Sequence, residues 1–158
     1  MTTNTRNQKG FTLVELLIVV ITLGILAAVV IPQFNSAATE SKEAALASNL
    51  ATIRQAVEMY KVQHNDAFPS GTAAVVVEQL TKETSLDGTV VAGGAYGPYL
   101  RNSFPKNPIS SDNTVAVGAM ADPFAPDDST GWSYDSTTGE FRANLTGNTL
   151  SGTAYSTL

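Results

Sequence analysis

The chain has 158 residues, no cysteine, one histidine and a formal net charge of −5. Its length suffices for one compact domain with a long helix, and the missing thiols exclude disulfides, thiolate metal sites and cysteine nucleophiles. The acidic balance disfavours nonspecific binding to nucleic acid and to anionic lipid surfaces. The sequence also lacks a Gly-x-Ser-x-Gly or phosphate-cradling glycine motif, so we expect no catalytic residues and interpret His64 as a solvated helix end.

A basic leader precedes a long apolar segment. Arg6 and Lys9 are the charged residues of the leader, and residues 11–31 that follow are almost entirely apolar. At a rise of 1.5 Å per residue this segment forms about 31 Å of helix, which matches a hydrocarbon layer of about 30 Å. We predict a single membrane-spanning helix, with the leader in the cytoplasm and the rest of the chain exported. The alternative is a cleaved secretory signal and a mature chain that starts at Val29.

One carboxylate, Glu15, interrupts the apolar segment. An acid at the middle of a membrane helix costs roughly 2.5–3.5 kcal/mol on insertion scales, and less near the interface, so we expect it to pair with a cation. It ends the sequence Lys-Gly-Phe-Thr-Leu-Val-Glu at residues 9–15, which resembles the prepilin N-terminus shared by type IV pilins and type II secretion pseudopilins. The resemblance implies that a membrane peptidase cleaves after Gly10 and methylates the new amine of Phe11, and that Glu15 stays in the mature chain.

The resemblance extends from Lys9 to about Tyr60 and implies a function. A chain of this kind is a structural subunit of a type II secretion pseudopilus or of a type IV pilus-like filament, nearest to the major pseudopilins. It polymerises through its N-terminal helix with copies of itself and with other pilins or pseudopilins. Its other implied partners are the prepilin peptidase and methyltransferase, the inner-membrane assembly platform and, before assembly, membrane lipid.

The same resemblance implies a location. The chain is first a single-pass protein of the bacterial inner membrane with a periplasmic C-terminal domain, and later part of a periplasmic or cell-surface filament. An adhesive or DNA-uptake minor pilin and a membrane-anchored hydrolase are the alternatives. Many type IV pilins close their C-terminal region with a disulfide, so the lack of cysteine favours pseudopilins or disulfide-free pilins. Another staple, or contacts within the polymer, must then hold this region.

Four residues are predicted to act in assembly, namely Phe11, Glu15, Gly24 and Pro32. The free amine of Phe11 can pair with Glu15 of the same subunit or of a staggered neighbour. Because desolvation offsets much of the gain, we expect this pair to select the register of the subunits, with a tolerated interfacial Glu15 as the alternative. Gly24 and Pro32 cost about 1 and 3 kcal/mol inside a helix. We therefore expect the segment between them to loosen on assembly, with a plain kink as the alternative.

The sequence predicts one long helix within residues 11–64. In its second half, apolar side chains recur three or four residues apart and charged side chains occupy the remainder, which indicates one buried face. The apolar positions are Leu46, Leu50, Ile53, Val57 and Tyr60. Once residues 1–10 are removed as the leader, we expect this face to pack on a C-terminal domain of residues 65–158. A coiled-coil dimer is the alternative.

The C-terminal domain is expected to begin with a short helix. Residues 72–84 predict this helix, although their valines alone would favour a strand. Residues 86–88 form a predicted turn. Residues 93–100 form a tight loop, and we expect its two tyrosines and its leucine to pin it to the core.

Alternation of residues on both sides of a turn predicts a β-hairpin at residues 131–145. Trp132 and Tyr134 share one face and would close over the helix, although a ligand site is the alternative for this aromatic cluster. The side chains expected to face water are Ser133, Glu140 and Arg142. With residues 115–117 as a third strand, the expected fold is α+β, a long N-terminal helix packed on a small antiparallel sheet, as in the pilin fold.

Acidic residues cluster in the C-terminal half of the chain. Major pseudopilins bind calcium in a C-terminal loop, so the resemblance implies that this chain can bind calcium through carboxylate oxygens. The predicted ligands are Asp122, Asp127 and Asp128. Their spacing is not that of an EF-hand, and solvated turns are the alternative. The predicted function itself requires no cofactor.

Overall fold

The computed structural model describes residues 10–101, 103–120 and 124–158. The charged leader residues and Asp122, one of the predicted calcium ligands, lie outside the described residues. The chain divides into two compact units, Met1–Thr39 and Glu40–Leu158, and each is described on its own.

Helix α1 (Leu13–Gln63) confirms the predicted long helix and continues through Gly24 and Pro32. Proline has no N–H, so the carbonyl of Ala28 lacks its helical donor. The Ser36 hydroxyl donates to the Pro32 carbonyl at 3.2 Å one turn later. The segment is therefore helical in this subunit, and its loosening in a filament stays a prediction.

The N-terminal part of α1 is apolar and exposed within the first unit. Leu13 is 80 % exposed and Phe34 72 % exposed, and the large apolar side chains between them are also exposed. Within the part of the chain that the structure describes, α1 is the helix that is long and apolar enough to cross a membrane. An apolar surface of this extent requires lipid or other protein chains to cover it.

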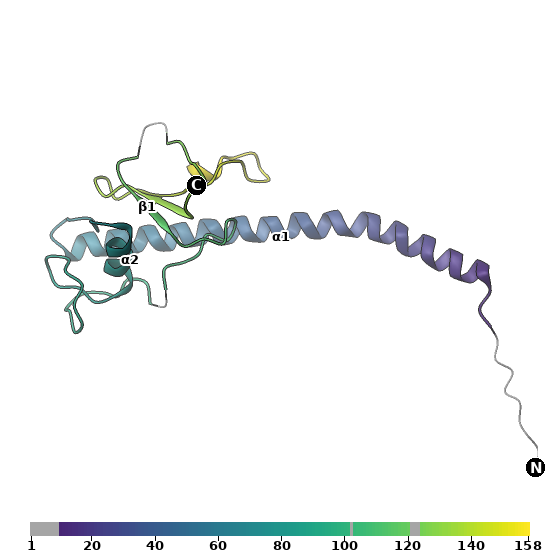
Figure 1. Ribbon diagram of the computed structural model, residues 1–158, viewed down its shortest axis with the longest axis horizontal. Helices are drawn as coiled ribbons and strands as arrows, with labels where there is room; N and C mark the ends of the chain where they lie inside the picture. Colours follow the sequence, from purple (N-terminus) through teal and green to yellow (C-terminus); the bar gives the residue numbers. More distant parts are fainter. Residues whose placement is uncertain (1–9, 102, 121–123) are drawn as a thin grey trace, which may run out of the picture. The chain divides into compact units, whose positions relative to one another are not determined.

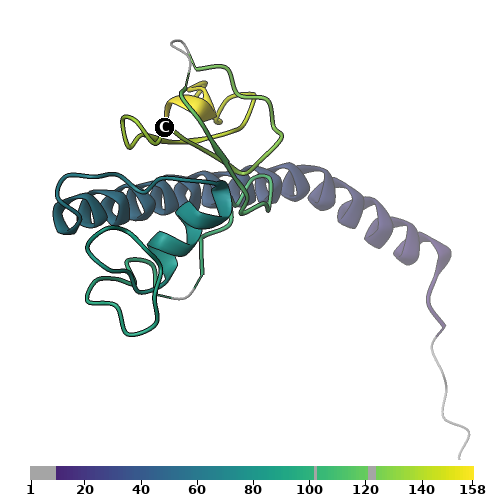
Figure 2. The same cartoon turned by 60° about the vertical axis from the view of Figure 1, so that its left-hand side comes forward.

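In the second unit, the second half of α1 contributes the predicted face to the core. Leu46, Leu50, Ile53, Val57 and Tyr60 are each at most 2 % exposed, which confirms the prediction from their spacing. Figures 1 and 2 show the sheet on one side of this part of α1 and the loops that follow the short helix α2 on the other. The coiled-coil alternative is therefore wrong for this face, because its own domain already covers it.

Helix α2 (Ala73–Thr81) confirms the helix predicted in residues 72–84 and rules out a strand there. Val76 and Leu80 face the core and are fully buried. Helix propensity is weak for valine, but the burial of Val76 and, one turn later, of Leu80 outweighs this local preference. The helix ends at Lys82, whose backbone is extended.

The turn after α2 is confirmed, and the loop is confirmed for Tyr99 and Leu100, whereas Tyr96 is half-buried and is not among the side chains packed on the core. Gly88 has a φ of +83°, and a side chain at this position would collide with the Tyr60 hydroxyl, so glycine fits the turn for two reasons. In the following loop, Leu100 is buried and Tyr99 packs against the core. The Tyr99 hydroxyl also donates to Gln63 Oε1 at 2.8 Å, which ties the loop to the end of α1.

Three short strands form the sheet in the order β1 (Val115–Val117), β2 (Trp132–Tyr134), β3 (Phe141–Ala143). Strands β2 and β3 pair antiparallel, with Trp132 opposite Ala143, and this confirms the predicted hairpin. Strand β1 pairs with β2 in parallel, so the sheet is mixed and the expectation of a purely antiparallel sheet is corrected. The reason is the long connection between β1 and β2, which is sufficient to return the chain for parallel pairing.

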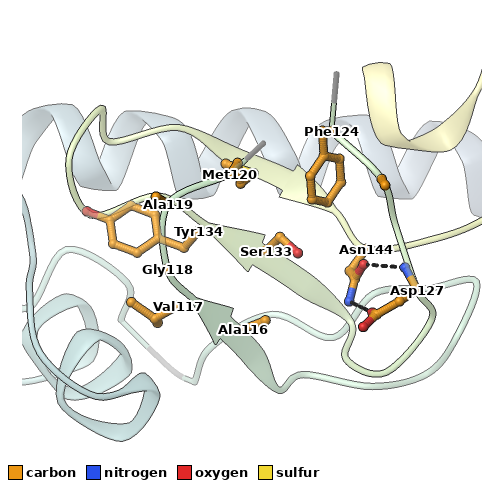
Figure 3. Close-up of a pocket in the computed structure, with 11 residues that line it drawn as sticks. Ala116, Val117, Gly118, Ala119, Met120, Phe124, Asp127, Ser133, Tyr134 and Asn144 are labelled. Atoms are coloured by element: carbon orange, nitrogen blue, oxygen red, sulfur yellow. Dashed lines mark hydrogen bonds between the residues drawn. The ribbon is translucent and has the colours of Figure 1, made fainter. Parts of the chain in front are cut away.

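The outer face of β2 is covered, contrary to the expectation that Ser133 faces water. Ser133 is 6 % exposed. Figure 3 shows it near Ala116 of the neighbouring strand, with Phe124 above it and Asn144 beside it. The exposed Glu140 is placed as predicted, whereas Arg142 is half-buried and pairs with Glu140 at 2.6 Å. The chain after β1 therefore shields a face that the alternation alone assigns to solvent.

His64 is buried rather than solvated, so that expectation is wrong. It is 2 % exposed, and its ring stacks on Tyr60 with 3.8 Å between the ring centroids. Its Nδ1–H donates to the Tyr60 carbonyl at 2.8 Å, and its Nε2 lies 3.0 Å from the Thr84 hydroxyl. His64 thus joins the last turn of α1 to the segment after α2.

Candidate functional site

A capping box begins helix α1. The Glu15 carboxylate accepts from the backbone N–H and from the hydroxyl of Thr12, each at 2.8 Å, and the Glu15 N–H donates to the Thr12 hydroxyl at 3.2 Å. These bonds satisfy donors that a helix start otherwise leaves without a partner. They also explain why α1 begins at Leu13 rather than at the predicted Phe11.

Thr12 is a partner of Glu15 that the sequence analysis did not predict, because only a cation was expected there. The signal was present in the sequence, because Thr-x-x-Glu before an apolar run is the usual pattern of a capping box. The acid lies in the first turn of α1, where the helix dipole also favours negative charge. Glu15 therefore has hydrogen-bond partners within its own helix start.

The structure places Gly10 and Phe11 immediately before this box. Both residues are exposed, and among the described residues no atom beyond the chain neighbours lies within 4 Å of the position a Cβ would take at Gly10. Phe11 is 84 % exposed. Because Phe11 is here bonded to Gly10, its nitrogen is a peptide N–H and carries no charge. Cleavage after Gly10 and the Phe11–Glu15 pair both stay predictions.

Hydrogen bonds from α1 hold the C-terminal segment of this cysteine-free chain. Arg54 donates to the Phe141 carbonyl, from Nε at 3.1 Å and from Nη2 at 2.8 Å, and Nη2 also donates to the Leu158 oxygen at 2.7 Å. Partial burial lowers the pKa of Arg54, although the guanidinium stays charged. The fork of Arg54 thus joins α1, β3 and the C-terminal segment.

Glu43, further back along α1, holds the same segment at a second point. Its Oε1 accepts from the Leu150 N–H at 2.8 Å and from the Tyr155 hydroxyl at 3.1 Å. Burial, and then the bond to this carboxylate, raises the pKa of the Tyr155 hydroxyl. Tyr155 begins the 3₁₀ helix η1 (Tyr155–Thr157), so both clamps act on the last part of the chain. They supply the staple that the cysteine-free sequence requires.

The two predicted calcium ligands that the structure describes have partners within the protein. Asp127 Oδ1 accepts from the Ser129 N–H at 3.0 Å and from Asn144 Nδ2 at 2.6 Å, which Figure 3 shows for Asn144. These hydrogen bonds, with that of the Ser129 hydroxyl first, lower the pKa of Asp127. Asp128 accepts from the N–H and the hydroxyl of Thr146. Among the described residues, no three His, Cys, Asp or Glu side chains converge to hold a metal, so the fit to calcium is incomplete.

A shallow pocket of about 260 Å³ lies over the outer face of β1 and β2 (Figure 3). Of the described residues that line it, Asp127 and Tyr134 have ionisable side chains. Asp127 is engaged as above. The Tyr134 hydroxyl donates to the Pro69 carbonyl at 2.9 Å, and burial raises its pKa. Both ionisable groups thus have hydrogen-bond partners within the protein.

The chain is similar to known filament proteins. The family model of the prokaryotic N-terminal methylation motif matches residues 5–31. Over 65 residues the chain is 45 % identical to type II secretion system core protein G of Pseudomonas aeruginosa, and the match covers 41 % of this chain and 45 % of the relative. Over 71 residues it is 39 % identical to the type IV wide pilus major component of Thermus thermophilus, with 45 % and 53 % covered. The chain thus spans about half the length of these two relatives.

A longer match includes part of the C-terminal domain. Over 110 residues the chain is 32 % identical to type II secretion system core protein G of Vibrio cholerae, and the match covers 68 % of this chain and 69 % of the relative. No solved structure matches the chain. The methylation motif, the long apolar helix and this extended similarity agree with one another. The chain therefore belongs to the family of type II secretion pseudopilins and type IV pilins.

Proposed function

We propose that the chain is a structural subunit of a type II secretion pseudopilus, assembled through α1. The observation that carries this proposal is the exposed apolar half of α1, which begins with the Thr12–Glu15 box directly after Gly10 and Phe11. An apolar helix that starts with a satisfied carboxylate can remain in lipid and later pack against copies of itself. The role is structural, as it is for the relatives.

A pseudopilus is favoured over a pilus by the extent of similarity. The match to core protein G of Vibrio cholerae covers 68 % of the chain, whereas the match to the wide pilus component covers 45 %. The absence of cysteine and the clamps of Arg54 and Glu43 fit a subunit without a C-terminal disulfide. A type IV pilus-like filament is the second candidate, supported by the pilus relative.

Assembly then requires a series of partners. We propose that a prepilin peptidase cleaves after Gly10 and methylates Phe11, and that an inner-membrane platform transfers the subunit from lipid to the filament. The basic leader supports an orientation with the N-terminus in the cytoplasm and the C-terminal domain in the periplasm. The exposed backbone around Gly10 supports access by the peptidase.

The function requires no cofactor, and calcium binding through Asp122, Asp127 and Asp128 stays a prediction. Isothermal titration of the domain with calcium tests it, together with the thermal midpoint in calcium and in chelator. Heat of binding that disappears in Asp127→Asn would support the site. No heat and an unchanged midpoint would remove it.

Electron microscopy of cells that express the chain with an assembly system, and N-terminal sequencing of sheared filaments, test the main proposal. The expected result is a filament whose subunits begin with methylated Phe11. Gly10→Leu is the matched control, because the position is open in the structure and the substitution is expected to block cleavage alone. Subunits that retain the leader, or a chain that stays monodisperse without lipid, would overturn the proposal.

A further inference from the structure

Leu150 is held at the tip of a polar turn in the C-terminal segment. It is 60 % exposed. The turn is closed by two backbone bonds, Thr149 N–H to the Thr153 carbonyl at 2.8 Å and Gly152 N–H to the Thr149 carbonyl at 2.9 Å. The Leu150 N–H itself donates to Glu43. Turn tips favour small or polar residues, so Leu150 is an apolar side chain held exposed in an otherwise polar turn.

The same unit also has an apolar depression that none of the described residues fills. It has a volume of about 540 Å³ and is lined by Arg54, Gln55, Glu58, Met59 and Val62 on α1. Met59 is 52 % exposed and Val62 is 73 % exposed. The depression can take an aliphatic side chain, because Met59 and Val62 supply apolar walls and the long side chains beside them supply their carbon stems.

Leu150 and the depression lie at opposite ends of the domain. The bond to Glu43 places Leu150 beside that residue of α1, whereas Met59 is sixteen residues further along, about 24 Å at 1.5 Å per residue. Figure 1 shows the yellow C-terminal segment and the C-terminal end of α1 at these two ends of the unit. Within one subunit the two surfaces therefore cannot meet.

An open polymer requires two different, complementary surfaces on each copy, and here they lie at different positions along α1. A contact between unlike surfaces repeats from copy to copy and produces a filament when the rotation does not close a ring. We propose that Leu150 of one copy inserts into the Met59–Val62 depression of a neighbouring copy in the filament. This inference rests on the proposed function, which supplies the second copy as the occupant.

The electrostatics of the two surfaces are compatible with this contact. The turn from Gly147 to Thr153 contains no charged residue, so its insertion brings no charge into the depression. The guanidinium of Arg54 at the edge of the depression is already bonded to the Phe141 and Leu158 oxygens and keeps those bonds. The contact thus brings no further charge into the depression, where Glu58 is the other charged residue of the lining.

Cysteine cross-linking tests the contact in a chain that has no cysteine of its own. The double variant Leu150→Cys with Met59→Cys is assembled into filaments and then oxidised, and Leu150→Cys with Val62→Cys is treated in the same way. The expected result is a ladder of dimers, trimers and longer species on a denaturing gel, since each copy would bond to the next. A disulfide requires Cα atoms within about 7 Å, so no bond can form inside one subunit.

The matched control is Leu150→Cys with Leu86→Cys, because Leu86 is 49 % exposed but does not line the depression. If the unsubstituted chain forms filaments but neither double-cysteine variant gives a ladder, the contact is overturned and the proposed function stays intact. A ladder as strong in the control would overturn it too. Failure of the unsubstituted chain to form filaments would overturn the proposed function and the contact together. As a second readout, Leu150→Ser should fold normally and give filaments several-fold shorter, and filaments of normal length would contradict the contact.

Discussion

In the uncleaved chain Glu15 is bonded to Thr12 and not to Phe11. The carboxylate takes both donors of Thr12 at 2.8 Å and so begins α1 while the nitrogen of Phe11 is still a neutral peptide N–H. Cleavage after Gly10 would create a charged amine at Phe11. The carboxylate could then pair with this amine, in its own subunit or in a neighbour. We expect the exchange of partners to accompany assembly.

Substitutions at Glu15 separate its charge from its capping bond. Glu15→Ala removes both, whereas Glu15→Gln keeps a side chain that can accept from Thr12 but removes the charge. We expect both variants to insert into the membrane and to give a low yield of filaments, because neither can pair with the Phe11 amine. Membrane extraction and the amount of subunit in sheared filaments measure the two steps. A normal filament yield from Glu15→Ala would contradict the assignment.

The reciprocal substitution is Thr12→Val. It keeps the charge of Glu15 and removes the hydroxyl, which should cost the start of α1 about 1 kcal/mol. We expect increased hydrogen exchange in the first turn and a smaller loss of filaments than in Glu15→Gln. Thr12→Ser retains the hydroxyl and is the matched control. An equal loss of filaments in Thr12→Val and Glu15→Gln would mean that the cap is required as much as the charge.

Arg54 should stabilise the domain through its bonds to Phe141 and Leu158. Arg54→Met keeps most of the stem and removes the fork, which leaves partly buried carbonyls without donors, so we expect unfolding free energy to fall by about 2 kcal/mol. Arg54→Lys should recover only part of this, because an ammonium cannot reproduce the planar fork. Urea unfolding of a fragment from Glu40 onward measures the difference. Equal stability of the Met variant and the natural chain would show that the clamp is dispensable.

Local patterns predicted much of this fold because the features concerned are themselves local. The spacing from Leu46 to Tyr60 located the buried face of α1, and the alternation around residues 131–145 located the hairpin. The parallel pairing of β1 was not predictable in this way, because the connection between β1 and β2 has no periodic signal. Ser133 was misplaced for the same reason, since residues distant in sequence cover its side of the sheet.

The residues of the candidate site also differ in whether a local sequence pattern identifies them. Gly10, Phe11 and Glu15 form a motif that is legible in the sequence, and Thr12 could have been identified from its spacing to Glu15. The clamp of Arg54 joins residues far apart in the chain, and no local pattern indicates it. Long-range polar contacts of this kind depend on how the elements pack, so only the three-dimensional structure identifies them.

His64 is another residue whose burial the sequence did not predict. Its burial predicts that it contributes to stability. His64→Ala should lower the unfolding free energy by about 2 kcal/mol, because it opens a cavity beside Tyr60 and removes a bonding partner of Thr84. His64→Asn is the matched control, since its amide nitrogen can still donate to the Tyr60 carbonyl. We expect the Asn variant to lose less. Urea unfolding that gives the same midpoint for the Ala variant and the natural chain would contradict the structural role of His64.

Acid should unfold the domain through its hydrogen-bonded aspartates. Bonds from the Ser85 hydroxyl, and then from Thr89, lower the pKa of Asp87 to about 2 from an ordinary value of 3.8. Bonds from Thr114 lower the pKa of Asp112 as well. A folded-state pKa below the unfolded value means that the unfolded chain binds the proton more readily. These carboxylates therefore stabilise the fold above pH 3.8, and the contribution is lost as the pH falls toward 2.

Urea unfolding at a series of pH values between 2 and 5 measures this loss of stability. Asp87→Asn cannot titrate, so its stability should decline less steeply with acid than that of the natural chain. Ser85→Ala should resemble it in slope, because without the hydroxyl the pKa of Asp87 returns toward its ordinary value and the folded and unfolded chains bind the proton alike. If both variants kept the full slope, the acid sensitivity of the domain would have to originate in carboxylates other than Asp87.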